Sequence, residues 1–363
     1  DLSHIFFDAV WGMALAEILT GYAASLYPLV AAARTTRAAA TPIALATTAA
    51  FVSAAHDAIG RTPAEVSAET GAVDLRAINI LRQRMEKIEL RLTINDLLIL
   101  ARCAHSTEYR LSPAVGAALD GMSALAGGAQ LVQRIRAHLD EQRGINPALL
   151  IPMDASNADP RMRVFPATFR NPLPQLLPRL SRCRILVDEL RRGPDTKLQR
   201  EFDHERALLY ADLRMFGALL QAFKQVTMRG ESFTTASLRL MGHLPGLMQN
   251  LVDLIPQKIG ILNEIIKGHE VFSNVGQVVA TSTLTRFASA RDDGTTKQLV
   301  WGIMSDASGQ LYITLRDFRP HIGPLLQGGR IDLANALAQD YVDSYAATTN
   351  ALVRSIQRVL AYK

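Results

Sequence analysis

Two alternating apolar segments near the C-terminal end place the strongest constraint on the fold. Residues 297–304 (KQLVWGIM) and 310–317 (QLYITLRD) flank a turn at Asp306–Gly309 and predict an antiparallel hairpin. A closing amphipathic helix is expected over Leu333–Tyr362, with apolar residues at helical spacing. The hairpin therefore argues against a purely helical interaction protein.

The remaining sequence predicts further helices and a smaller number of strands. Strands are expected at Ala148–Met153, Arg163–Phe169, Glu270–Gln277 and Ser282–Ala290, and Pro166 places the second of these at an edge or bulge. Helical patterns cover Phe7–Tyr27, two helices that begin at Asp74 and Thr93, Pro113–His138 with a break at Gly127, Leu176–Arg192, Lys197–Val226 and Ser237–Ile266. The fold class is therefore α/β of a mixed, α+β-like kind, without regular βαβ alternation or a glycine-rich phosphate loop.

Composition excludes several classes of protein. In 363 residues, 48% are hydrophobic and 20% charged, which predicts a sizeable core and excludes wholesale disorder. The net charge is only +5, and acidic residues dilute even the most basic stretch, Arg179–Arg206, so a solvated surface is favoured over nucleic-acid binding. Ala38–Ala55 is uncharged but contains a proline and several hydroxyls, which favours a soluble helix or loop over a membrane span.

The candidate chemistry begins in the first eight residues, where His4 precedes Asp8 by four positions. An imidazole titrates near pH ~6.5 and can act as a general base. An aspartate at a helix start can hold the surrounding turn through backbone amides or an arginine. On local evidence alone, a core histidine beside a helix-capping aspartate is the favoured interpretation.

Five segments, in their order along the chain, resemble parts of a known family. Ser3–Ala9 (SHIFFDA) resembles the HHxxxDG motif of condensation domains and wax ester synthases, within the HxxxD acyltransferases that use coenzyme A. Residues 92–98 (LTINDLL) resemble the "TVNDV" helix start, and residues 272–276 (FSNVG) the "SNVPGP" strand. Residues 146–173 resemble the family's strand pair, and residues 300–318 resemble its closing hairpin.

The resemblance implies a chloramphenicol-acetyltransferase-like fold of two lobes with a tunnel between them. Residues 1–70 would be the end of the N-terminal lobe with the motif and crossover, and residues 71–363 the C-terminal lobe. His4 would be the catalytic base that transfers an acyl group from a coenzyme A or carrier-protein pantetheine thioester to an alcohol or amine. Ser273, Asn274 or a nearby hydroxyl would supply an oxyanion donor.

Asp8 would be structural, paired with an arginine, and the family resemblance leaves Arg170, Arg286 and Arg316 as candidates. The implied partners are the acyl thioester and a small-molecule acceptor, with no tightly bound cofactor and no nucleic acid. Because the chain opens at the motif, we expect an upstream segment or chain to complete the first lobe.

Two departures keep a second function open. Ser3 stands where the motif has its first histidine, and Ala9 stands where it has glycine. A catalytically degenerate protein that serves as a binding or scaffold subunit is the alternative. The other histidines show no metal-ligand spacing, so no metal site is expected. Cys103 and Cys183 suggest reduced thiols in a cytoplasmic protein, with peripheral membrane attachment as a further option.

Overall fold

The computed structural model describes most of the chain from residue 64 onward. The described residues are 64–125, 127–154, 164–193, 195–228, 270–277, 299–305 and 309–362, with isolated residues 18, 22, 25, 48–50, 52 and 53 before them. The predicted segments Ser237–Ile266 and Ser282–Ala290 lie outside these residues. Of Phe7–Tyr27, only Ile18, Tyr22 and Ser25 are described, and all three are helical and exposed.

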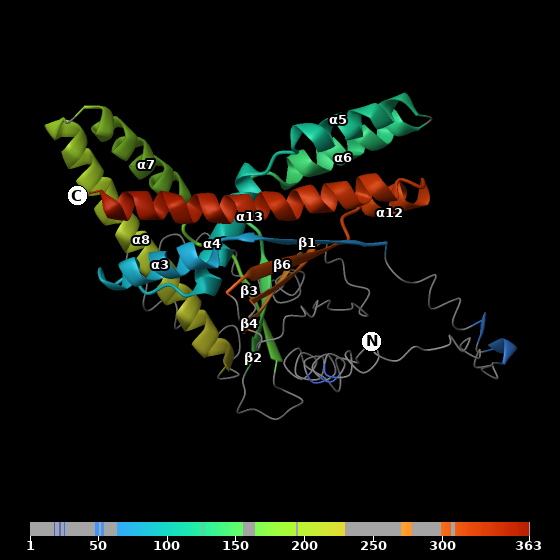
Figure 1. Cartoon of the computed structure of the whole chain (residues 1–363), viewed down its shortest axis with the longest axis horizontal. Coiled ribbons are helices and arrows are strands. Elements are labelled where there is room, and N and C mark those ends of the chain that lie inside the picture. The colour runs from blue at the N-terminus through green and yellow to red at the C-terminus, as the bar shows by residue number, and fades with distance from the viewer. Residues whose placement is uncertain are drawn as a thin grey trace, which may run out of the picture.

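A six-stranded mixed sheet forms the centre of the described structure (Figure 1). Its strands are β1 (Val66–Val73), β2 (Leu149–Asp154), β3 (Val164–Phe169), β4 (Glu270–Gln277), β5 (Leu299–Ser305) and β6 (Leu311–Asp317), in the spatial order β1-β6-β5-β4-β2-β3. The central strands β2, β4 and β5 run parallel, while β1, β6 and β3 pair antiparallel with their neighbours. The mixed α/β class predicted from the sequence is thereby confirmed.

The predicted hairpin is confirmed as β5 and β6, which pair antiparallel with Trp301 opposite Leu315. The edge position of β3, which contains Pro166, is also confirmed. Strand β1 was not predicted, because VSAETGAV mixes small and charged residues and carries no strong apolar alternation. It spans residue 70, where the boundary between the two lobes was predicted, and it pairs with β6 along its length.

The described helices follow the predicted pattern closely. They are α3 (Leu75–Glu86), α4 (Ile94–Glu108), α5 (Pro113–Gly121), the short 3-10 helix η1 (Met122–Ala124), α6 (Gly128–Gln142), α7 (Leu176–Arg192), α8 (Thr196–Met228), α12 (Ile322–Gln327) and α13 (Ile331–Ala361). The predicted break at Gly127 is confirmed: this residue has a φ of 71°, a left-handed conformation that glycine adopts without steric cost. Within the described part of the chain, no helix combines the length and the apolar character that crossing a bilayer requires.

Two of the helices have the N-terminal capping side chains that the sequence predicted. The Asp74 carboxylate accepts a hydrogen bond from the Ala77 amide at 2.8 Å and caps α3. At α4, the Thr93 hydroxyl accepts from the Asp96 amide, and the Asp96 carboxylate accepts from the Thr93 amide at 2.8 Å. This reciprocal capping box satisfies two amides that have no partner inside the helix.

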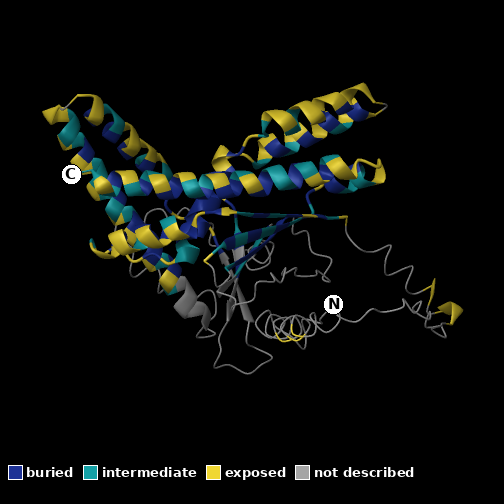
Figure 2. Ribbon diagram, viewed as in Figure 1, coloured by how far each residue is buried: buried dark blue, intermediate teal, exposed yellow. Residues whose placement is uncertain are grey.

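Helices α4 and α13 form the core with the sheet. Every residue of α4 from Leu97 to Ser106 is buried, so this helix lies inside the protein rather than on its surface. Helix α13 lies along β1 and β6 (Figure 1), and its Tyr345 hydroxyl donates to the Leu98 carbonyl of α4 at 2.8 Å. Figure 2 shows buried residues concentrated where these helices meet the strands.

The strands present alternating residues to two faces, which we call the helix-covered face and the second face. Trp301 contacts Tyr345 of α13, Glu270 contacts Arg102 of α4, and Phe169 contacts Phe216 of α8, all from the helix-covered face. The residues between them along each strand belong to the second face. On β5 the second-face residues are also buried, so both faces of this strand are shielded from water.

Candidate functional site

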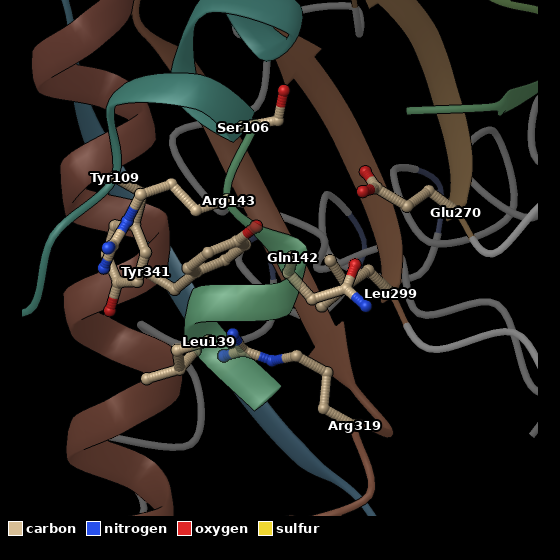
Figure 3. Close-up of a pocket in the computed structure, with 9 residues that line it drawn as sticks. All are labelled: Ser106, Tyr109, Leu139, Gln142, Arg143, Glu270, Leu299, Arg319 and Tyr341. Carbon is tan, nitrogen blue, oxygen red and sulfur yellow. The ribbon is translucent and has the colours of Figure 1, made fainter. Parts of the chain in front are cut away.

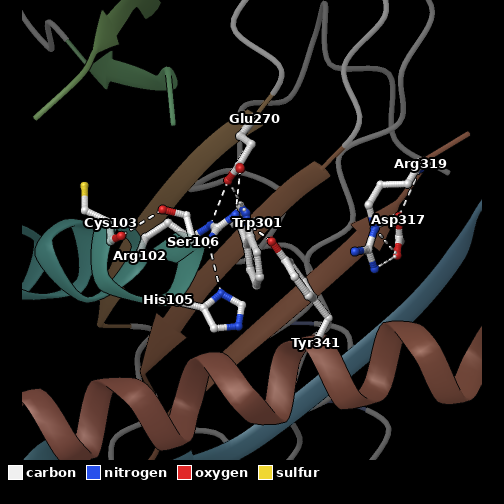
Figure 4. Close-up of polar contacts among 9 residues, drawn as sticks. All are labelled: Arg102, Cys103, His105, Ser106, Glu270, Trp301, Asp317, Arg319 and Tyr341. Atoms are coloured by element: carbon white, nitrogen blue, oxygen red, sulfur yellow. Dashed lines mark hydrogen bonds and ion pairs between the residues drawn. The ribbon is translucent and has the colours of Figure 1, made fainter. Parts of the chain in front are cut away.

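A buried ion pair joins α4 to the sheet across 168 positions of sequence (Figure 4). The Arg102 guanidinium donates to both carboxylate oxygens of Glu270, at 2.8 and 2.7 Å. The Trp301 indole donates to the same carboxylate at 3.0 Å. Burial alone would lower the pKa of Arg102, but the Glu270 carboxylate raises it above its ordinary value, so the guanidinium stays charged.

A second buried pair lies beside the first, at the end of β6. The Arg319 guanidinium donates to both oxygens of Asp317, which is 0% exposed. Tyr341 of α13 lies between the two pairs: its ring is 4.2 Å from the Arg319 guanidinium carbon and its hydroxyl accepts from Arg102 at 2.8 Å. The arrangement is therefore electrically neutral, with an aromatic ring between two paired cations.

His105 extends this network without a charge of its own. Its Nδ1 lies 3.0 Å from the Arg102 guanidinium, which can only donate, so Nδ1 is the acceptor and Nε2 carries the proton. Burial and the nearby Arg102 and Arg319 lower the pKa of His105 well below its ordinary value. This imidazole is a fixed hydrogen-bond acceptor and is poorly placed to act as a base.

Two further histidines meet between α6 and the start of α12. The rings of His138 and His321 lie 5.8 Å apart, and both nitrogens of His321 are buried without a hydrogen-bond partner among the described residues. Burial, followed by the charge of Arg319, lowers the pKa of His321 to about 3 and also lowers that of His138. Both side chains are therefore neutral at physiological pH.

A small cavity opens beside the network (Figure 3). Its volume is about 20 Å³, which holds roughly one water molecule. Its lining includes Glu270 and Arg319, which are each part of an ion pair, and the Tyr341 ring. It also includes Ser106, whose hydroxyl donates to the Cys103 carbonyl at 2.8 Å. A cavity of this size, lined by polar groups that already have hydrogen-bond partners, suits a structural water and is too small for a thioester substrate.

The whole predicted catalytic motif, Ser3–Ala9, lies outside the described residues, and His4 and Asp8 lie outside them with it. The same is true of Arg286. Of the arginines considered as partners of Asp8, Arg316 forms an ion pair with Glu65 and Arg170 is exposed.

The predicted pair Ser273 and Asn274 lies in β4 and divides between the two faces. Asn274 is on the helix-covered face, and its amide donates to the Asn95 side chain of α4 at 3.3 Å. Two of the segments that carry the family resemblance, LTINDLL and FSNVG, therefore meet although they are 179 positions apart. Ser273 is half-buried on the second face, and its hydroxyl makes no hydrogen bond to the described residues.

The buried network was not predicted from the sequence. Arg102 offered one signal, since a charge inside the apolar run LLILARCA of a helix needs a partner. The identity of that partner depends on tertiary pairing and has no local signature. Both cysteines, in contrast, are buried free thiols as expected, and Trp301 is a core residue as expected.

Among the described residues, no group of three or more His, Cys, Asp and Glu side chains is close enough together to hold a metal ion. Comparison with protein-family models, with characterised proteins and with solved structures gives no match to this chain. The functional interpretation therefore depends on the geometry of the chain itself.

Neutralising Glu270 should destabilise the protein strongly. The Glu270→Gln variant leaves the Arg102 charge buried without its counter-ion, and we expect the free energy of unfolding to fall by about 3 kcal/mol in urea titration. The control is Asp188→Asn, which removes the carboxylate of the exposed pair with Arg358 and should cost less than about 1 kcal/mol. Equal losses in the two variants would contradict the central role of the buried pair.

Acidification should also destabilise the fold through His321. Its folded-state pKa of about 3 lies below the ordinary 6.5, so between these values the unfolded chain binds a proton that the folded chain does not. The free energy of unfolding should therefore fall as the pH drops below 6.5, by roughly 1 kcal/mol per pH unit for this histidine. The free energy of unfolding, measured by urea titration at each pH, should depend less steeply on pH in His321→Gln than in the wild type. In His204→Gln, at an exposed position, the dependence should equal that of the wild type. A wild-type pH dependence in His321→Gln would show that His321 is not the group that destabilises the fold in acid.

Proposed function

We propose that this protein is an acyltransferase that moves an acyl group from a coenzyme A or carrier-protein thioester to an alcohol or amine. In this proposal the described sheet and helices form the C-terminal lobe of a two-lobe chloramphenicol-acetyltransferase-like fold. The second face of the sheet would line the tunnel between the lobes. His4 would face that tunnel from the other lobe, and Asp8 would be structural and point away from it.

The observation that carries the proposal is that two neighbouring residues of β4 lie on opposite faces of the sheet. Asn274 is held by Asn95 on the helix-covered face, whereas the hydroxyl of the neighbouring Ser273 lies on the second face and makes no hydrogen bond to the described residues. A partly exposed hydroxyl in this position can donate a hydrogen bond to a bound group. Of the two residues named from the sequence as oxyanion donors, this geometry favours Ser273.

The chemical step requires a general base and a hydrogen-bond donor to the oxyanion. The His4 imidazole would remove the proton from the acceptor hydroxyl or amine, whose oxygen or nitrogen then attacks the thioester carbonyl carbon. The Ser273 hydroxyl would donate to the oxygen that becomes negative in the tetrahedral intermediate. As the carbonyl re-forms, the carbon–sulfur bond breaks and the leaving thiolate takes the proton from His4, which yields a free thiol and an ester or amide.

Replacement of His4 tests the proposed activity directly. Wild-type protein should release free thiol from acyl-CoA in the presence of an alcohol or amine acceptor, and His4→Ala should abolish that release because no base remains. The measurement is thiol release across a panel of acyl-CoA chain lengths and acceptors. Absence of release from the wild-type protein would contradict the proposal and favour a binding or scaffold subunit; equal rates in the two proteins would exclude His4 as the base.

Replacement of Ser273 tests the oxyanion donor. Ser273→Ala should lower kcat by about 100-fold, with a much smaller change in KM, because the lost hydrogen bond forms mainly in the transition state. The matched control is Ser67→Ala, which removes an exposed hydroxyl from the second face of the edge strand β1. A kcat for Ser273→Ala within a fewfold of wild type would remove Ser273 from the mechanism.

A further inference from the structure

His138 of α6 and His321, the residue directly before α12, are neighbouring histidines whose buried nitrogens lack partners. Only 4% of the His321 surface is exposed, and neither of its ring nitrogens has a hydrogen-bond partner among the described residues. The Nε2 atom of His138 is also buried, and it too has no partner in that part of the chain. A buried polar atom that gives up its hydrogen bonds to water is costly, so a bound water or ion is expected at such an atom.

The separation of the two rings fits a shared metal ion. Zn²⁺ bonds imidazole nitrogens at about 2.0–2.1 Å, so the ring centroids of two histidines on one ion lie at most about 6.5 Å apart. The centroids of His138 and His321 are 5.8 Å apart, and their planes meet at 59°. No hydrogen bond joins these two described side chains, because the His321 nitrogens have no partner. The spacing therefore suits an atom held between the two rings.

The surrounding charges keep both imidazoles in the form that binds metals. A metal ligand must be a neutral imidazole, and burial, followed by the charge of Arg319, lowers the pKa of both His138 and His321. The Arg319 charge would also repel a bound cation, but Asp317 neutralises it by accepting hydrogen bonds at 2.9 and 2.6 Å. Glu141, an exposed residue one turn further along α6, adds a negative charge close enough to oppose the lowering of the His138 pKa.

We propose that His138 and His321 form a zinc site that joins α6 to the start of α12, with water molecules as the remaining ligands. Helices α5 and α6 project from the body beside α12 and α13 (Figure 1), so the ion would fasten this pair of helices to the end of the sheet that β6 supplies. Spacing along the chain could not indicate the site, because its two ligands come from separate elements. The site is independent of the proposed acyl transfer.

The test is calorimetric titration of the chelator-treated full chain with Zn²⁺ at neutral pH. The wild type should bind one ion, and His138→Gln and His321→Gln should each weaken binding by about tenfold or more, because each removes one of two protein ligands. His204→Gln, at an exposed position of α8, is the matched control and should bind like the wild type. Zn²⁺ should also raise the thermal midpoint of the wild type and of this control, because the ion binds the folded form.

X-ray absorption at the zinc edge then identifies the ligands. The loaded wild type should show two imidazoles with oxygen ligands, and sulfur scattering would overturn the proposal. A wild type that does not bind Zn²⁺ would also overturn it and would leave a bridging water between the rings. Wild-type affinity in both histidine variants would place the ion elsewhere and would equally overturn it. If His321→Gln does not fold, His138→Gln decides alone, since it changes a partly exposed side chain.

Discussion

The buried pair between Arg102 and Glu270 is the interaction on which the rest of the described structure depends. It ties the central helix α4 to the start of β4, and through Tyr341 it also reaches the long helix α13. Two charges inside a protein are tolerated only when their hydrogen bonds are satisfied, and here the Glu270 carboxylate also accepts from Trp301. The pair therefore fixes how the helices are placed on the sheet.

This anchoring assigns different roles to the two faces of one strand. Along β4, Glu270 and Asn274 are engaged by α4, which holds the strand in position. Ser273 faces the other way, and its hydroxyl makes no hydrogen bond to the part of the chain that the structure describes. A strand fixed firmly on one face offers a rigid support for chemistry on the other, which is a general requirement for a preorganised oxyanion donor.

The sequence predicted the elements well where the determinants were local. Thr93 and Asp96 cap α4 as their spacing predicted, and the alternation of residues 311–317 correctly indicated a strand. Strand β1 was missed because its stability comes from pairing with β6 and packing under α13, not from its own residues.

The candidate site was less predictable than the fold. The family resemblance named Ser273 and Asn274 together, since both lie in the segment that resembles the "SNVPGP" strand. Only the contact of Asn274 with Asn95 separates their roles, and that contact joins residues 179 positions apart. The partners of Arg102 and Arg319 were likewise invisible in sequence, because buried ion pairs are selected by tertiary geometry.

The most direct test of this account is a crystal structure of the protein with a non-hydrolysable acyl-CoA thioether that retains the carbonyl as a ketone. The ligand is expected to lie on the second face, with its carbonyl oxygen within hydrogen-bond distance of the Ser273 hydroxyl and the His4 imidazole near the reacting carbon. A ligand bound instead on the helix-covered side near Arg319 and Ser106, or at a position remote from Ser273, would contradict it.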